Sequence, residues 1–176
     1  DIDLWKNKIQ SALGPNGKII TEIIPLFEHV IGRQPDIPSL GPVESQNRFR
    51  LVFRNFIKVL ADREHPLVIS LDDLQWADSD SLQLLKLFST DSDIKHLFII
   101  GSYRSNETPD SHPLHLVLEE VRQSGTTVNT IFLKPLKTGH VSQLLSDTLN
   151  HRKEKMYPLA ELLIRKTGGN PFFINE

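Results

Sequence analysis

The chain has 176 residues, a length that suits one domain with a real core, since domains usually contain about 100 to 200 residues. Its hydrophobic fraction of 39% and charged fraction of 24% exclude a disordered or fibrous class. A formal net charge of -2 argues against a nucleic-acid surface, and the absence of cysteine excludes a disulfide framework or a thiolate metal site.

Helical periodicity dominates residues 1–62. Apolar residues recur near the 3.6 period in three segments, around Ile2–Ile9, Ile19–Ile31 and Phe49–Leu60. Residues 14–17, Gly-Pro-Asn-Gly, separate the first two segments, and a proline-rich connector over residues 32–42 precedes the third. We therefore expect three helices ahead of any sheet.

From His65 onwards, strand and helix patterns alternate. Leu67–Leu71 is a continuous apolar run, typical of a strand buried on both faces of a parallel sheet. The elements expected after it are a helix at Ser79–Ser89, a strand at His96–Tyr103, a helix at His112–Gln123, a strand at Val128–Lys134, and helices at Thr138–Leu149 and Pro158–Lys166. This order predicts βαβ units with right-handed crossovers in a three-layer α/β fold.

Two acids, Asp72 and Asp73, follow the first predicted strand. Residues 68–73 match the Walker B pattern, in which a buried strand delivers a carboxylate to the edge of the sheet where ligands bind. One carboxylate must hold Mg²⁺, which suits Asp72, and another must position the water that attacks the γ-phosphate of ATP, which suits Asp73. On these six residues alone, a strand that merely ends in an acidic turn explains the pattern equally well.

The continuation of this motif is more specific. Residues 71–78, Leu-Asp-Asp-Leu-Gln-Trp-Ala-Asp, resemble the signature of the STAND class of AAA-like signalling ATPases, which includes maltose-regulator-type transcription activators and the ATPase segments of bacterial multi-sensor kinases. Residues 38–42, 47–49 and 64–67 resemble the multi-sensor kinases in particular. Within the motif, Asp78 is expected to cap the next helix, and Trp76 is expected to pack rather than to contact a ligand.

The resemblance implies a fold and a domain organisation. The fold is a three-layer P-loop NTPase-like parallel sheet with N-terminal helices and the start of a C-terminal helical lid. Residues 1–137 would form a partial P-loop ATPase core, with helices over residues 1–62 and the sheet region over 65–137, and residues 138–176 would begin the lid. The cofactors implied are ATP and Mg²⁺, and the partners are other domains of a larger signalling protein. Nucleic acid and membrane contacts are not expected, and the location implied is cytoplasmic.

Two further sites follow from the same resemblance. Arg104 lies just after the second predicted strand, where the AAA-like class keeps its sensor 1 residue, and a guanidinium there can contact γ-phosphate oxygens. A solvated loop arginine is the alternative. The STAND lid motif, whose proline packs by the adenine, is resembled by Gly169, Asn170 and Pro171. An ordinary junction, with glycine at the end of one helix and proline in the first turn of the next, explains these residue types as well.

A Walker A loop, G-x-x-x-x-G-K-[ST], is missing from the sequence. Gly17-Lys18 fails the pattern because position 12 is alanine and Ile19 replaces the hydroxyl residue. We therefore expect a fragment that begins after this loop and cannot hydrolyse ATP alone. Asp73 stands where many AAA-like ATPases carry glutamate, which suits slow hydrolysis.

The function predicted is an ATP-binding and slowly ATP-hydrolysing switch module of a signal-transduction protein. The alternatives are a non-enzymatic ATPase-like interaction scaffold and the ATPase domain of a maltose-regulator-type transcription activator. His112 and His115 have a spacing that can share a metal, but no third ligand is evident nearby, so we expect them at a helix start.

Overall fold

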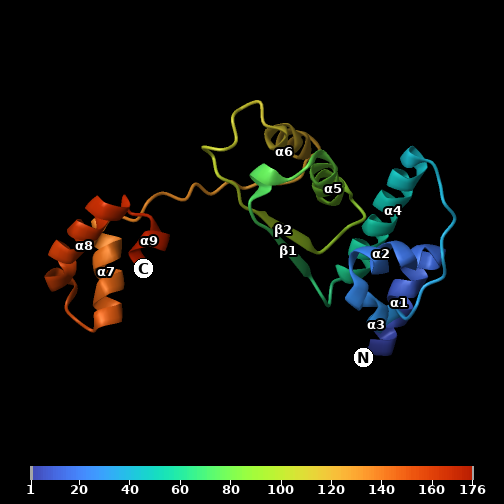
Figure 1. Ribbon diagram of the computed structural model, residues 1–176, viewed down its shortest axis with the longest axis horizontal. Coiled ribbons are helices and arrows are strands. Elements are labelled where there is room, and N and C mark those ends of the chain that lie inside the picture. The colour runs from blue at the N-terminus through green and yellow to red at the C-terminus, as the bar shows by residue number, and fades with distance from the viewer. Residues whose placement is uncertain (1, 176) are drawn as a thin grey trace. The chain divides into compact units, whose positions relative to one another are not determined.

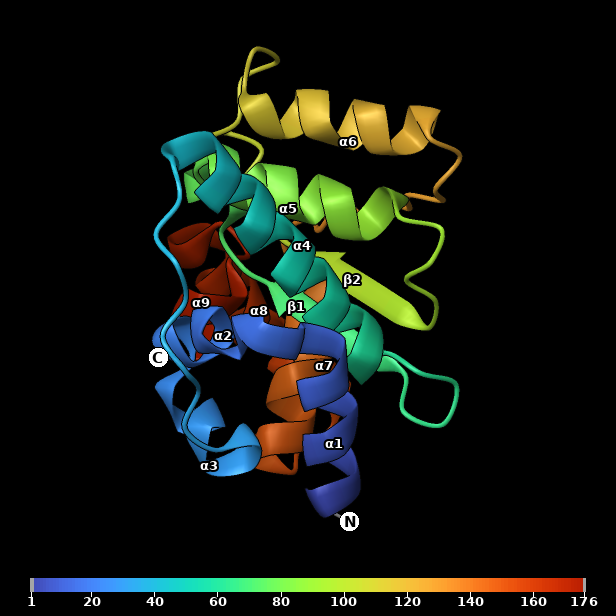
Figure 2. The same cartoon turned by 90° about the vertical axis from the view of Figure 1, so that its right-hand side faces the viewer.

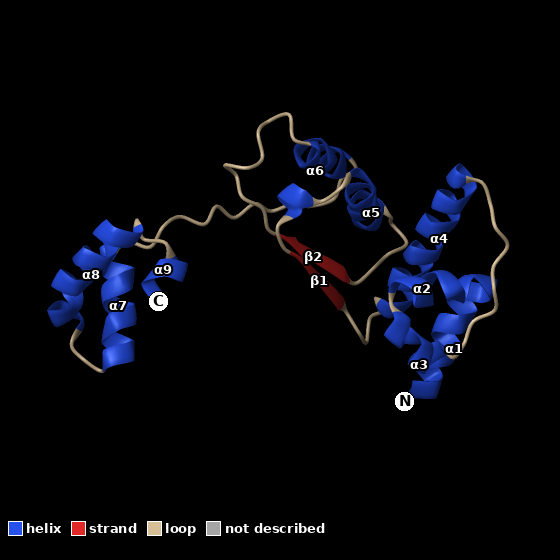
Figure 3. Ribbon diagram, viewed as in Figure 1, coloured by secondary structure: helices blue, strands red, loops and turns tan. Residues whose placement is uncertain are grey.

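The computed structural model describes residues 2–175, and the chain divides between Val128 and Asn129 into two compact units (Figure 1). The first unit contains α1 (Ile2–Leu13), α2 (Gly17–Ile23), α3 (Glu28–Ile31), α4 (Pro42–Leu60), β1 (Leu67–Leu71), α5 (Ser79–Thr90), β2 (Leu97–Gly101) and α6 (Pro113–Gln123). The second contains α7 (Thr138–Leu149), α8 (Lys153–Thr167) and α9 (Pro171–Asn175). The fold is therefore mostly helical with a small sheet, as the colouring of Figure 3 shows.

The N-terminal helices form where the apolar periodicity predicts them, with one correction. The helix expected over Ile19–Ile31 is broken, because α2 ends at Ile23 and a short 3₁₀ turn, Pro25–Phe27, separates it from α3. Proline lacks the N–H that a continuous helix needs and disfavours helical backbone in the residue before it. Ile24 accordingly leaves the helical region, at φ -121° and ψ 80°.

The two strands of the sheet, β1 and β2, are parallel neighbours, as predicted. Their register runs from Leu67 opposite Leu97 to Leu71 opposite Gly101. Helix α5 makes the connection between them and packs side by side with α6 (Figure 1, Figure 2). Because the strands are parallel, the residues that follow each of them emerge at one edge of the sheet.

The prediction that β1 is buried on both faces is wrong for this structure. Exposure alternates along β1 and along β2 as far as Ile100, and the outward side chains Val68, Phe98 and Ile100 are 57%, 63% and 47% exposed. The inward residues, such as Ile69 and Ile99, pack against the hydrophobic cores of the unit. A continuous apolar run is compatible with burial on each side, but within residues 2–175 one side of this sheet is exposed.

The third strand expected at Val128–Lys134 is also wrong, because this segment has no regular structure. Ile131, Phe132 and Leu133 are 80%, 75% and 93% exposed. A strand requires a neighbour that shares its backbone hydrogen bonds, and over residues 2–175 the sheet consists of β1 and β2 alone. The segment is therefore apolar enough for a strand, but it has no partner strand to share its backbone hydrogen bonds.

Two hydrophobic clusters hold the first unit together. The first joins the N-terminal helices to the inner face of the sheet, and Ile20, Ile31 and Phe56 lie at its centre. The second lies between α5, α6 and the ends of the strands, and it includes Leu74 and Leu114. This second cluster anchors residues next to the carboxyl edge of the sheet.

The second unit is a helical hairpin followed by a short helix. Helix α7 packs against α8, and Val141 in α7 and Ala160 in α8 are fully buried. The Ser142 hydroxyl donates to the Lys153 carbonyl at 2.6 Å. Helix α8 begins at Lys153, earlier than the predicted start at Pro158, which lies inside the helix. Throughout residues 2–175, each helix is too short or too polar to cross a membrane.

Candidate functional site

The loops after β1 and β2 are joined by backbone hydrogen bonds that continue the sheet. The Ser102 N–H donates to the Leu71 carbonyl at 2.9 Å, and the Leu74 N–H donates to the Ser102 carbonyl at 2.9 Å. This pairing fixes the two loops against each other at the carboxyl edge. The sequence predicted that Asp72 and Arg104 would meet at this edge, and both residues lie in these loops.

Asp72 is exposed and has a hydroxyl partner across the sheet. The Ser102 Oγ donates a short hydrogen bond to Asp72 Oδ1, and the Asp73 N–H donates to the same oxygen at 3.1 Å. The Ser102 hydroxyl first, and the Asp73 N–H second, hold the pKa of Asp72 below its usual range. Asp72 is therefore an anionic oxygen donor at neutral pH.

Asp73 occupies a left-handed backbone conformation, at φ 54° and ψ 43°, which is uncommon for a residue other than glycine. Its Oδ1 accepts a hydrogen bond from Gln75 Nε2 at 2.8 Å and lies 3.6 Å from Arg104 Nε. The tight turn places Asp73 beside Asp72 while directing the chain into the 3₁₀ turn Leu74–Trp76. Backbone strain of this kind concentrates at functional sites.

Arg104 is held between two carboxylates at the end of the β2 loop. Besides Asp73, it contacts Glu107 Oε1 from Nη1 at 3.1 Å, and its guanidinium lies 5.8 Å from the centre of the Trp76 ring. Trp76 was expected to pack rather than to contact a ligand, but its side chain is 69% exposed, so the packing expected of it is wrong. The ring therefore lies largely in solvent, within cation–π distance of the Arg104 guanidinium.

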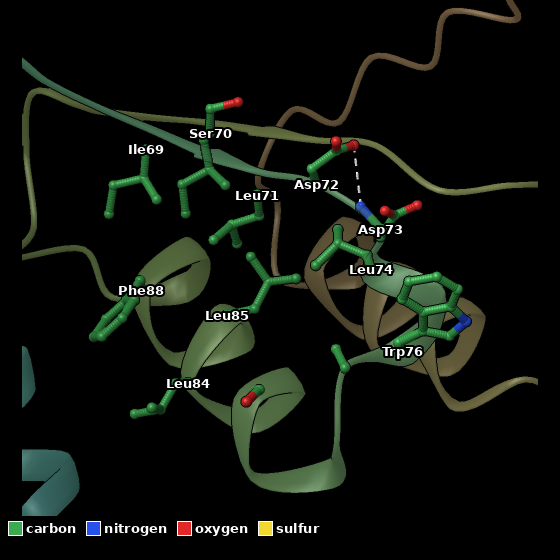
Figure 4. A pocket seen from close by; sticks show the side chains of 13 residues that line it. Ile69, Ser70, Leu71, Asp72, Asp73, Leu74, Trp76, Leu84, Leu85 and Phe88 are labelled. Carbon is green, nitrogen blue, oxygen red and sulfur yellow. Dashed lines mark hydrogen bonds between the residues drawn. The ribbon is translucent and has the colours of Figure 1, made fainter. Parts of the chain in front are cut away.

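A cavity of about 570 Å³ lies beside β1 and α5. Figure 4 shows Asp72 and Asp73 at one end of it and the apolar side chains of Ile69 and Phe88 at the other. Most of its lining is apolar, so the two acids supply its polar end. An apolar cavity with a few convergent polar groups is the usual form of a small-molecule site.

The donor atoms at this edge fit a magnesium ion. Asp72, Asp73 and Ser102 offer oxygen atoms only, which is the ligand type that Mg²⁺ prefers. Across residues 2–175, no cluster of three or more histidines, cysteines or acids forms a complete metal cage. Mg²⁺ usually binds through one or two carboxylates together with waters and substrate phosphates, so the present donors match that mode.

The three candidate lid residues lie in the second unit, whereas Asp72, Asp73 and Arg104 lie in the first. Gly169 has φ 78° and accepts a hydrogen bond from the Leu136 N–H at 2.8 Å. The Asn170 side chain caps α9 by accepting from the Phe172 N–H at 3.0 Å, and Pro171 is the first residue of that helix. The residues expected from the sequence to end one helix and begin the next are thus in those positions.

Two local expectations for the loop regions are confirmed. The Asp78 carboxylate accepts from the Ser81 N–H at 2.7 Å and caps α5. His112 caps α6, since its Nδ1 accepts from the Leu114 N–H at 3.2 Å. No role for Ser102 was predicted from the sequence, because its place opposite Asp72 depends on the parallel register of β1 and β2.

Two comparisons find known sequences to which this chain is similar. Residues 1–100 match the family model described as an AAA ATPase domain. The chain is 25% identical, over 237 aligned residues, to hybrid signal transduction histidine kinase G of Dictyostelium discoideum. That alignment covers 99% of this chain but spans only 7% of the relative.

No solved structure matches the chain significantly. The family model covers more than half of the sequence, including β1, the paired acids and most of β2. The chain belongs to the AAA ATPase domain family.

Proposed function

We propose that this chain is part of the nucleotide-binding module of a signal-transduction protein of the STAND class, and that the module binds MgATP and hydrolyses it slowly. The observation that carries this proposal is the anionic Asp72, paired with Ser102, next to the Asp73–Arg104 pair at the carboxyl edge of a parallel sheet. The signalling relative supports the context, and the cytoplasm is where such a module would meet MgATP.

The roles proposed for the site residues follow from their chemistry. Asp72 would hold Mg²⁺, Asp73 would orient the attacking water, and Arg104 would exchange its carboxylate partners for the γ-phosphate. Bound Mg²⁺ neutralises charge on the phosphates during transfer. The phosphate cradle is proposed to come from a Walker A loop upstream in the same protein, because the present residues supply acids rather than a cradle of amides.

Residues 138–176 are proposed as the start of the lid, with Gly169, Asn170 and Pro171 near the base of the nucleotide. The support is the similarity of these residues to the lid motif and the tight α8–α9 turn that they build. Nucleotide state would then change the arrangement of core and lid, and other domains of the protein would respond to that change.

The three-layer fold is likewise a proposal. Val68, Phe98 and Ile100 form an apolar outer face on the sheet, and we propose that further chain of the intact protein covers it. Since the sequence contains no cysteine, Phe98→Cys introduces a single thiol. In the intact protein this thiol should resist alkylation, whereas Asp110→Cys, at an exposed position, should react; equal reactivity would refute the third layer.

The test of the function uses a longer chain that restores the upstream sequence. Asp73→Asn should keep MgATP affinity, because the magnesium ligand Asp72 remains, but should suppress turnover, because the charge at the water is lost. Titration calorimetry and a phosphate-release assay measure the two properties. Asp110→Asn, at an exposed position outside the site, is the matched control.

Two results would contradict the proposal. Full turnover by Asp73→Asn would remove that residue from the mechanism. Failure of the longer chain to bind MgATP would favour the scaffold function instead, in which the ATPase-like fold is retained for docking.

A further inference from the structure

Gln75 is a buried polar residue in the 3₁₀ turn after β1, with 6% of its surface exposed. Its Nε2 donates to Asp73 Oδ1 at 2.8 Å, and its Oε1 accepts from the Arg104 backbone N–H at 3.2 Å. A buried amide costs free energy unless both of its ends are paired. Both ends are paired here, one with each of the two loops that carry the candidate catalytic residues.

The main chain of Gln75 is fixed as well. Its carbonyl accepts from His112 Nε2 at 3.1 Å, while His112 Nδ1 accepts from the Leu114 N–H at 3.2 Å. Because Nδ1 acts as an acceptor, we assign the ring proton to Nε2. The neighbouring Leu74 is buried in the cluster that contains Leu114. Gln75 is therefore anchored by α6 as well as by the sheet.

The chemistry of this position requires an amide of this length. Glutamate would accept from Arg104 but would place a second carboxylate against Asp73. Leucine would fill a similar volume but would leave the Asp73 and Arg104 groups without their partner. The left-handed backbone of Asp73 adds to this requirement, because a strained residue keeps its orientation only where its surroundings enforce it.

We propose that Gln75 is the positioning residue of the site: its side-chain amide fixes the Asp73 carboxylate relative to the Arg104 loop. This inference rests on the proposed ATPase function, in which Asp73 orients water. Within residues 2–175, the hydrogen bonds of Gln75 go to Asp73, Arg104 and His112 and not to Asp72, so Gln75 should act on turnover rather than on MgATP affinity. A change at Gln75 should therefore lower kcat and leave the dissociation constant of MgATP unchanged.

The test compares Gln75→Leu and Gln75→Glu in the full-length protein. Gln46→Glu is a matched control, because Gln46 Nε2 also donates to a carboxylate, Asp80 Oδ1, at 2.7 Å, but on an exposed surface. Phosphate release gives kcat, calorimetry gives MgATP affinity, and NMR amide exchange without nucleotide gives the protection of the Arg104 N–H. Thermal unfolding confirms that each variant is folded.

Both Gln75 variants should lose about tenfold or more in kcat, as is typical when a partner that orients a catalytic group is removed. Their MgATP affinity should match the wild type, and Gln46→Glu should match it in both properties. Arg104 amide exchange should accelerate in Gln75→Leu, which lacks an acceptor, but not in Gln75→Glu, which keeps one.

Acidic pH provides a readout that a purely structural role would not move. In Gln75→Glu the introduced carboxyl faces Asp73, Arg104 and His112, and Glu107 lies beyond Arg104. On protonation it regains an O–H that can donate to Asp73. The kcat of Gln75→Glu, relative to wild type at the same pH, should recover as pH falls, whereas that of Gln75→Leu should not.

The failures of the two proposals are distinguishable. If the wild type hydrolyses MgATP and Gln75→Leu has the same kcat or the same Arg104 exchange rate, the inference is overturned and the proposed function stands. If Gln75→Leu does not fold, the kcat of the nearly isosteric Gln75→Glu decides whether the inference holds, and a kcat equal to that of the wild type overturns it. If the wild type does not bind MgATP, the proposed function is overturned, and the inference fails with it.

Discussion

Leu114 offers the most quantitative test of how the site is supported. It is fully buried between α5 and α6, two residues after His112, whose side chain holds the Gln75 carbonyl. Leu114→Ala removes three buried carbons, worth roughly 2.4 kcal/mol at about 0.8 kcal/mol each. The cavity left behind raises the expected loss in the free energy of unfolding to about 3–4 kcal/mol.

Urea unfolding followed by tryptophan fluorescence measures this loss. The sequence has two tryptophans, Trp5 and Trp76, and both lie in the first unit, so the signal reports that unit. Leu116→Ala, in the same helix, is the control, because Leu116 is 64% exposed and should cost no more than about 0.5 kcal/mol. Equal losses for the two variants, with unchanged m-values, would refute the assignment of α6 as the support of the site.

Three further predictions concern single contacts. Asp78→Ala removes the cap of α5 and should lower the urea midpoint, though by less than Leu114→Ala. The His65 backbone N–H, with the His65 side chain, Lys8 and the Glu64 N–H, lowers the pKa of Asp62 to about 2. The stabilisation that Asp62 contributes should therefore be complete above about pH 4, the ordinary pKa of an unfolded aspartate, and should be lost as pH falls towards 2. The urea midpoint of Asp62→Asn should accordingly depend less on pH in that window than the midpoint of the wild type. Gly169→Ala should accelerate amide exchange in α9 more than Gly168→Ala. Both glycines have positive φ, but only a Cβ at position 169 would clash with the Leu136 carbonyl oxygen.

Much of the fold was predictable because local patterns determine it. The strands at β1 and β2, their parallel pairing, and the helices α5 and α6 follow from apolar runs, helical spacing and caps. The failures occur where structure depends on partners rather than on local preference. The segment around Phe132 is apolar enough for a strand but has no neighbouring strand to pair with. Val68 is apolar, as buried residues usually are, but its side chain is exposed.

The site shows the same division. The motif located Asp72 and Asp73, and the end of β2 located Arg104, because strand ends are visible in a sequence. Hydrogen bonds between the loops are not visible, so the partners Ser102 and Gln75 emerged only with the geometry. Trp76 was misjudged because its burial depends on which neighbours surround the turn, and periodicity gives no information on them.

The spacing of contacts along the chain has a consequence for the order of folding. The α7–α8 hairpin closes over short sequence separations, as the contact between Ser142 and Lys153 illustrates. Pairing of β1 with β2 instead joins residues such as Leu67 and Leu97, with a whole helix between them. Loop closure makes non-local pairing slower than local helix docking. The helical hairpin should therefore fold earlier than the sheet, and the carboxyl edge should be among the last parts of the first unit to form.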